Sequence, residues 1–138
     1  MRRRRKSREY ALQVLFQLNI TKQEATAVLG QFQEHFSHNG DADEFMKLLV
    51  LGVLQHYKEL DRLIERYSEN WRLDRINIIE RNILRMALFE LLYCEEIPPK
   101  VTMNEAIDLG KRYGSEDSGG FINGILDRIQ NEVVRKPL

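Results

Sequence analysis

Residues 78–94, IIERNILRMALFELLYC, decide the fold because they form the most apolar stretch of the chain. Apolar residues recur there at three- and four-residue intervals and cover almost the whole circumference of a helix. A helix that is apolar on nearly all sides lies at the centre of a packed domain. The segment therefore predicts a central helix on which the other elements pack.

The rest of the chain also shows helical periodicity, and residues 45–67 form either one long helix or two helices with a kink around residues 55–58. Capping residues mark several helix starts: Ser7 for the first helix, and capping boxes at Thr21–Glu24 and Thr102–Glu105. No segment of any length shows strand periodicity. The sequence therefore predicts an all-α domain of about six or seven helices.

A polar connection, SEDSGGF at residues 115–121, separates the last two predicted helices. Gly114 is a natural end for the helix before it, and Ser118 or Asp117 can cap the helix after it. The glycines could bring backbone N–H groups to an anion, and Phe121 could stack on an unpaired base. Equally, the glycines could form a simple turn and Phe121 could belong to the core, and the residues alone leave both hypotheses open.

The strongest charge feature is the N-terminal block, where six of residues 2–8 are Arg or Lys. The remaining residues hold 15 basic and 21 acidic side chains, so the neutral chain combines a basic end with a body of net charge −6. Such asymmetry indicates a polyanion that contacts one end of the molecule. If all six cations contacted single-stranded phosphates, log K would fall with log salt with a slope of about −4. A nonspecific basic tail would have the same composition.

Catalytic and metal-binding motifs are not found in the sequence. HExxH, P-loop and GxGxxG patterns are absent, and His35 and His38 lack further ligands nearby. The single cysteine, Cys94, lies in an apolar run and is expected to be a buried thiol in a reducing cytosol. No apolar run approaches the length of a membrane span. We therefore expect a cytoplasmic protein that is not an enzyme and binds no cofactor or metal.

Three blocks of this sequence resemble the NusB family of transcription antitermination factors. They are RRxxRxxALQVLFQ near the start, the central ERNILRMALFELLY, and the most specific block, IPPKVTMNEAIDLGKRYGSEDSGGFINGILD. They occur in this order from residue 4 to residue 127, and the resemblance covers nearly the whole chain. The resemblance implies one all-helical domain, 1–138, of two packed three-helix subdomains. We expect these at about residues 8–70 and 71–138, after a mobile basic arm at residues 1–7.

The resemblance also implies a function and partners. Family members bind the boxA element of nascent ribosomal RNA transcripts jointly with NusE, a small-subunit ribosomal protein. The complex joins other Nus factors on RNA polymerase and suppresses premature termination. Some family members pair, so a homodimer that covers the basic helix is a further expectation.

Site residues follow from the resemblance position by position. The RNA-binding positions fall on Arg3, Arg4, Arg5, Lys6, Arg8, Glu116, Asp117, Ser118 and Phe121. The side that faces NusE includes Phe16, Glu80 and Arg85. Phe16 stands where the family usually has Tyr, so a hydrogen bond made by that hydroxyl is absent.

Two alternative functions belong to other classes of protein. One is an RNA-positioning module related to the N-terminal domain of ribosomal RNA cytosine methyltransferases, although 138 residues leave no room for a catalytic domain. The other is a helical interaction protein whose basic end binds polyanions without sequence preference.

Overall fold

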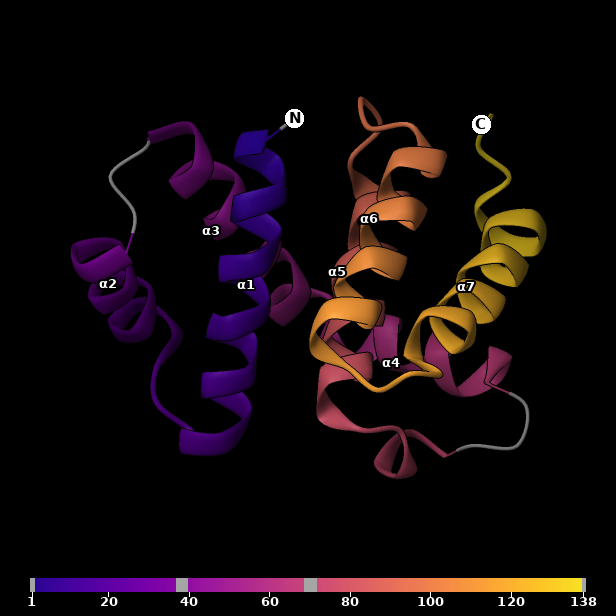
Figure 1. The fold of residues 1–138 in the computed structure, drawn as a ribbon, viewed down its shortest axis with the longest axis horizontal. Coiled ribbons are helices and arrows are strands. Elements are labelled where there is room, and N and C mark those ends of the chain that lie inside the picture. The colour runs from indigo at the N-terminus through magenta and orange to yellow at the C-terminus, as the bar shows by residue number, and fades with distance from the viewer. Residues whose placement is uncertain (1, 37–39, 69–71, 138) are drawn as a thin grey trace. The chain divides into compact units, whose positions relative to one another are not determined.

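The computed structural model describes residues 2–36, 40–68 and 72–137, without the side chains of residues 2, 3, 32–36 and 40–43. Within these residues the chain forms seven α-helices and two short helical turns, and no strand, which confirms the predicted all-α class (Figure 1). The elements are α1 (Arg2–Thr21), α2 (Ala25–Phe36), α3 (Gly40–Gln55), α4 (Tyr57–Tyr67), η1 (Leu73–Arg75), α5 (Ile78–Tyr93), α6 (Pro99–Tyr113), α7 (Ser118–Ile129) and η2 (Gln130–Val134).

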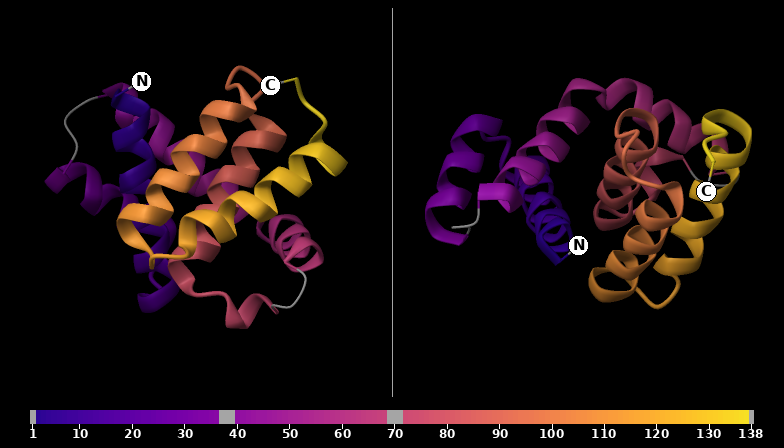
Figure 2. Two further views of the ribbon diagram at one scale, coloured as in Figure 1. Left: turned by 45° about the vertical axis from the view of Figure 1, so that its right-hand side comes forward. Right: turned by 90° about the horizontal axis from the view of Figure 1, so that it is seen from above.

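The helices gather into two compact units, Met1–Gln55 and His56–Leu138. In the first unit α1 packs along α3, and in the second α6 packs on both α5 and α7 (Figure 2). The boundary lies at residue 55, whereas the sequence placed it near residue 70, because α4 packs on α5 and α7. The second unit therefore holds four α-helices instead of the expected three.

Residues 45–67, which the sequence allowed to be one helix or two, form two helices with a complete break at His56 between α3 and α4. The His56 ring stacks on the Tyr93 ring with centroids 4.1 Å apart, which holds the start of α4 against the end of α5. The Tyr93 hydroxyl donates a hydrogen bond to Glu59. This bond, followed by burial and the Glu59 charge, raises the pKa of Tyr93 above its ordinary value of 10.0.

Helix α5 is the central helix that the apolar stretch predicts. Its residues from Asn82 to Leu91 are all buried, and Asn77 caps its start by accepting a hydrogen bond of 2.8 Å from the Glu80 backbone N–H. Cys94, directly after the helix, is buried as expected.

The basic block lies inside α1, which corrects the predicted helix start. The helix begins at Arg2, and Ser7 is a buried residue within it and not an N-cap. Arginine and lysine are good helix formers, so they extend the helix backwards from its apolar stretch. From Arg4 to Arg8 the block therefore has a regular helical geometry.

Both predicted capping boxes are also wrong. Thr21 is the last residue of α1, where its hydroxyl donates to the Gln17 carbonyl at 2.8 Å, and α2 starts at Ala25. Thr102 lies inside α6, which begins with Pro99 at a position where the missing N–H costs nothing. The buried Thr102 hydroxyl donates a hydrogen bond of 2.9 Å to the Glu90 carboxylate, so this threonine joins α6 to α5 instead of capping a helix. The sequence HNGD at residues 38–41 is typical of a turn, and it lies partly outside the described residues.

The corner between α6 and α7 is tightly packed around Gly114, which ends α6 as predicted. Any residue can adopt its φ of −97°, so backbone conformation does not explain why this position is a glycine. A Cβ added at Gly114 would lie 2.8 Å from the Gly110 carbonyl oxygen and 2.8 Å from the Ser118 Cβ. The absence of a side chain therefore lets the start of α7 approach the end of α6 (Figure 2).

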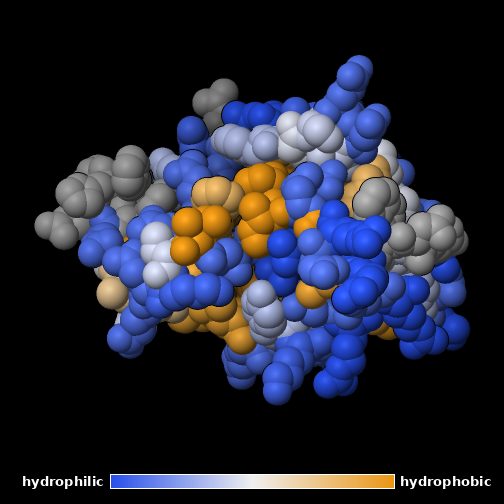
Figure 3. All heavy atoms as spheres, turned by 90° about the horizontal axis from the view of Figure 1, so that it is seen from below, coloured by the Kyte–Doolittle hydropathy of each residue, from blue (hydrophilic) through white to orange (hydrophobic). Residues whose placement is uncertain are grey.

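Hydrophilic residues predominate on the face of the molecule drawn in Figure 3, where apolar residues form smaller groups. Across the helices that the structure describes, none combines the length and the apolar character needed to cross a membrane.

Replacing Gly114 by Ala is expected to lower the free energy of unfolding by more than about 1 kcal/mol, because the new methyl group overpacks the corner. Gly124 is the matched control, since it lies exposed within α7 and a Cβ there meets nothing within 4 Å. Gly124→Ala is expected to stabilise the protein by about 0.5–1 kcal/mol. Urea unfolding of the two variants tests this, and an unchanged stability of Gly114→Ala would contradict it.

Candidate nucleic-acid interface

Among the α1 cations whose side chains the structure describes, two are exposed and two are packed. Arg5 and Lys6 are exposed, and the Lys6 ammonium lies 3.9 Å from the Glu9 carboxylate with 65% of the lysine side chain accessible. The Glu9 carboxylate is buried, but this long contact uses only one side of an ammonium group that is otherwise exposed, so the lysine is able to bind another anion. Arg5 and Lys6 are therefore the described α1 cations best placed to contact a phosphate.

Arg4 and Arg8 lie one turn apart and pack on an aromatic ring of α3. Their guanidinium carbons lie 4.9 Å and 5.4 Å from the centroid of the Phe45 ring. Arg8 is buried with 4% exposure, and Arg4 is half-buried. These cation–π contacts give both arginines a role in holding α1 on α3. The side chain of Arg3 lies outside the described part of the structure.

The second candidate element is the α6–α7 corner, which is organised by Ser118. The Ser118 hydroxyl donates to the Glu80 carboxylate at 2.7 Å and accepts from the Ser115 backbone N–H at 2.8 Å. Ser118 therefore does not cap α7, and Asp117, at the N-cap position, makes no capping hydrogen bond with its side chain. This corrects the predicted caps, because Ser118 is buried and bonds to α5.

The exposed part of the corner offers acceptors and part of an aromatic ring. Glu116 and Asp117 are exposed, and Phe121 is half-buried, so its ring is neither fully core nor fully accessible. Carboxylates repel phosphates but accept hydrogen bonds from base amino groups. The corner is thus suited to contact bases more than backbone.

Lys111 adds a cation to this corner that the sequence analysis did not single out. It is exposed in the last turn of α6, and a Cβ added at the buried Gly119 would lie 3.2 Å from the Lys111 Cγ. The aliphatic stem of the lysine thus lies across the glycine. The two residues lie in different helices, α6 and α7, so no pattern along one helix indicates this contact.

The three residues expected to face NusE lie in different environments. Phe16 is exposed on α1 with 39% of its surface accessible. Glu80 is half-buried and already accepts the hydrogen bond from Ser118. Arg85 is 1% exposed, so it differs from the surface residue that the sequence led us to expect.

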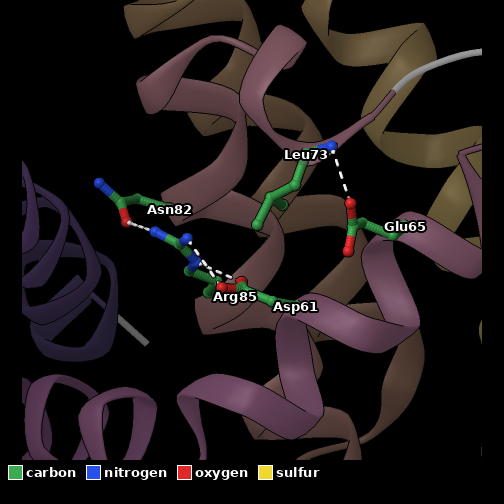
Figure 4. A network of polar contacts seen from close by, with 5 residues as sticks. All are labelled: Asp61, Glu65, Leu73, Asn82 and Arg85. Atoms are coloured by element: carbon green, nitrogen blue, oxygen red, sulfur yellow. Dashed lines mark hydrogen bonds and ion pairs between the residues drawn. The ribbon is translucent and has the colours of Figure 1, made fainter.

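Arg85 is the centre of a buried polar network in the second unit (Figure 4). Its Nε and Nη2 atoms donate to the two oxygens of Asp61 at 2.7 Å and 3.1 Å, and its Nη1 donates to Asn82 at 3.0 Å. The guanidinium also lies 4.2 Å from the centroid of the Tyr57 ring. A two-pronged pair of this kind joins α5 to α4, which gives Arg85 a structural role.

Among residues 2–36, 40–68 and 72–137, no three His, Cys, Asp or Glu side chains lie close enough to share a metal ion.

Fold and site together define an all-α protein that presents exposed cations on one helix and an acceptor-rich corner between two others.

A sequence profile of the NusB family matches residues 5–131. The chain therefore belongs to the NusB family.

Relatives and solved structures agree with this family. The chain is 50% identical to the transcription antitermination protein NusB of Syntrophus aciditrophicus (strain SB), covering 99% of this chain and 84% of that protein. It is similar to a solved structure of T. maritima NusB, with a TM-score of 0.85 and 39% identity over 94% of this chain and 91% of that one. A crystal structure of antitermination factors NusB and NusE in complex with dsRNA matches with a TM-score of 0.86 and 31% identity, covering 95% of this chain and 98% of that one.

Asp61→Asn is expected to lower the free energy of unfolding by about 3 kcal/mol, because it leaves the buried Arg85 charge without its anion. Asp74→Asn is the matched control, since its 3.6 Å pair with Arg72 is exposed and contributes little. Chemical denaturation of both variants tests the expectation. Equal stabilities would show that the Arg85–Asp61 pair does not support the fold.

Proposed function

We propose that this protein acts in transcription antitermination by binding boxA RNA of nascent ribosomal transcripts together with NusE. The observation that carries the proposal is the exposed pair Arg5 and Lys6 at the start of α1, in a chain of the NusB family. Other Nus factors and RNA polymerase complete the assembly in this proposal. Such a role requires binding surfaces and no catalytic group, and it is carried out in the cytoplasm, where nascent RNA is made.

The α1 cations contact the RNA backbone in this proposal. Arg5 and Lys6 bind phosphates, Arg3 is a further phosphate contact by position in the sequence, and Arg4 and Arg8 fix the helix through Phe45. The first turn of α1 contains arginines and no acidic residue, so its charge opposes the helix dipole. This costs some tenths of a kcal/mol, and a bound polyanion would offset it.

The α6–α7 corner contacts bases in this proposal. The accessible part of the Phe121 ring stacks on a base, and Glu116 and Asp117 accept hydrogen bonds from base amino groups. Ser118 is buried, so its contribution is to hold the corner on Glu80.

NusE binds in this proposal through the exposed ring of Phe16 and the accessible part of Glu80. Within the second unit, Arg85 supports α5, which carries Glu80, by joining it to α4 from the core, and it is not a contact residue in this proposal. A substitution of Arg85 would therefore weaken NusE binding only if it also lowered the free energy of unfolding.

The proposal is tested by the affinity for boxA RNA and for a scrambled RNA of equal length, measured with and without NusE over a series of salt concentrations. We expect boxA to bind more tightly than the scrambled RNA when NusE is present. Equal affinity for both RNAs with NusE present would instead favour a nonspecific polyanion-binding protein.

A pair of arginine variants controls for charge in the same experiment. Arg5→Ala is expected to make the slope of log K against log salt shallower by about 0.7, as for one phosphate contact on a single strand. Arg75→Ala removes an exposed arginine in η1 and is expected to leave the slope unchanged. The same slope in both variants would exclude a phosphate contact at Arg5.

A further inference from the structure

The chain turns back after α7 and brings a lysine near its C-terminus to the turn between α5 and α6 (Figure 2). The Lys136 ammonium donates hydrogen bonds of 2.9 Å to the backbone carbonyls of Cys94 and Ile97, across 42 and 39 residues of sequence. All three residues belong to the second unit, so the contact lies within one compact unit. One side chain thus joins the end of the chain to the end of the central helix.

The position of these carbonyls explains why a cation is favourable there. The last carbonyls of a helix have no partner within it, and they carry the negative end of the helix dipole. Cys94 is the C-cap residue of α5, and the last turn of that helix contains no basic residue. Glu95 and Glu96 follow directly and are exposed, so the next charges in the sequence have the unfavourable sign. Lys136 therefore supplies from a distance the cation that α5 itself lacks.

Local hydrogen bonds fix the path of residues 130–136. The Arg135 backbone N–H donates to the Gln130 carbonyl at 2.6 Å, and the buried Gln130 side-chain amide donates to the Lys136 carbonyl. Arg135 adopts a left-handed conformation with a φ of 53°, which ends η2. This conformation is unfavourable for an arginine, so further contacts are needed to hold the turn closed. The two bonds of the Lys136 ammonium are contacts of this kind.

We propose that residues 130–136 form a C-terminal strap, which closes on the end of α5 and opens as a local unit while the helices stay folded. Residues 131–133 within the strap are exposed, and segments with little buried surface open at a fraction of the global free energy of unfolding. Hydrogen bonds from a charged donor are stronger than neutral ones, so the Lys136 ammonium favours the closed state. Opening removes this donor from the Cys94 and Ile97 carbonyls, so the strap determines how firmly the turn before α6 is held. This inference does not rest on the proposed RNA-binding function.

Amide hydrogen exchange measured by NMR tests whether the strap opens as a local unit. The Arg135 N–H reports on the strap itself, and the Leu88 N–H reports on the buried centre of α5. In the wild type we expect the Arg135 amide to exchange much faster than the Leu88 amide, at a rate that low concentrations of urea do not change. Exchange of the Arg135 amide only through global unfolding, with the urea dependence of Leu88, would overturn the proposal.

A lysine variant tests the role of the charge. Lys136→Met keeps an unbranched side chain but removes the ammonium and its donors. We expect exchange of the Arg135 amide to become more than about tenfold faster, because a hydrogen bond from a charged group contributes strongly. The Ile97 amide, which bonds to the Cys94 carbonyl at 3.1 Å, is expected to exchange faster as well. Lys100→Met, which removes an exposed lysine from the first turn of α6, is the matched control and is expected to leave both rates unchanged.

A pair of Arg135 variants changes the strap while keeping Lys136. Arg135→Val is expected to speed exchange of the Ile97 amide, because a β-branched residue strongly disfavours a positive φ. Arg135→Asn removes the same charge but tolerates this conformation, so it is expected to keep the wild-type rate. Equal rates in the two Arg135 variants would overturn the proposal, as would an unchanged rate of the Arg135 amide in Lys136→Met.

Discussion

The hydrogen bond from the Ser118 hydroxyl to the Glu80 carboxylate joins the start of α7 to the start of α5, across 38 residues of sequence. Two local features make it possible. Asn77 caps α5 and thereby fixes the first turn that carries Glu80, and the absence of a side chain at Gly114 lets Ser118 approach the end of α6. Because the same hydroxyl also accepts from Ser115, one buried serine determines the conformation of the whole α6–α7 corner.

The basic residues of this protein fall into two groups, those packed within the fold and those exposed at the surface. Arg4 and Arg8 pack on Phe45, and Arg85 is buried against Asp61, so these three arginines stabilise the helices that carry the proposed binding residues. Arg5 and Lys6 remain accessible to a partner. In the proposed function, the basic residues that contact RNA are therefore those whose charge packing leaves exposed.

Periodicity predicts the parts of this fold that depend on burial. The central helix α5, the end of α6 at Gly114 and the buried Cys94 all follow from apolar spacing or from single punctuating residues, whereas the spacing left open whether the chain breaks near residue 56. Capping patterns predicted less well. Thr21 and Thr102 match the pattern of a helix start, but one ends α1 and the other bonds to Glu90 from inside α6.

The candidate site could be predicted only in part, because some of its residues are positioned by contacts between helices. The resemblance to NusB indicates which positions belong to the site, and the exposed Arg5, Lys6, Glu116 and Asp117 are accessible as a contact residue requires. Burial of Arg85 and the packing of Lys111 over Gly119 depend on contacts between helices, and spacing along one helix carries no information about them. The structure is needed to separate positioning residues from contact residues.

A double-mutant cycle of Glu80→Ala and Ser118→Ala tests the central claim that one hydrogen bond holds this corner in place. The quantity measured is the free energy of unfolding of the wild type, the two single variants and the double variant. We expect a coupling energy of about 1–2 kcal/mol between the two sites, as for a part-buried hydrogen bond from a hydroxyl to a carboxylate. Losses that add to within about 0.3 kcal/mol would show that the two side chains act independently, and would contradict the account.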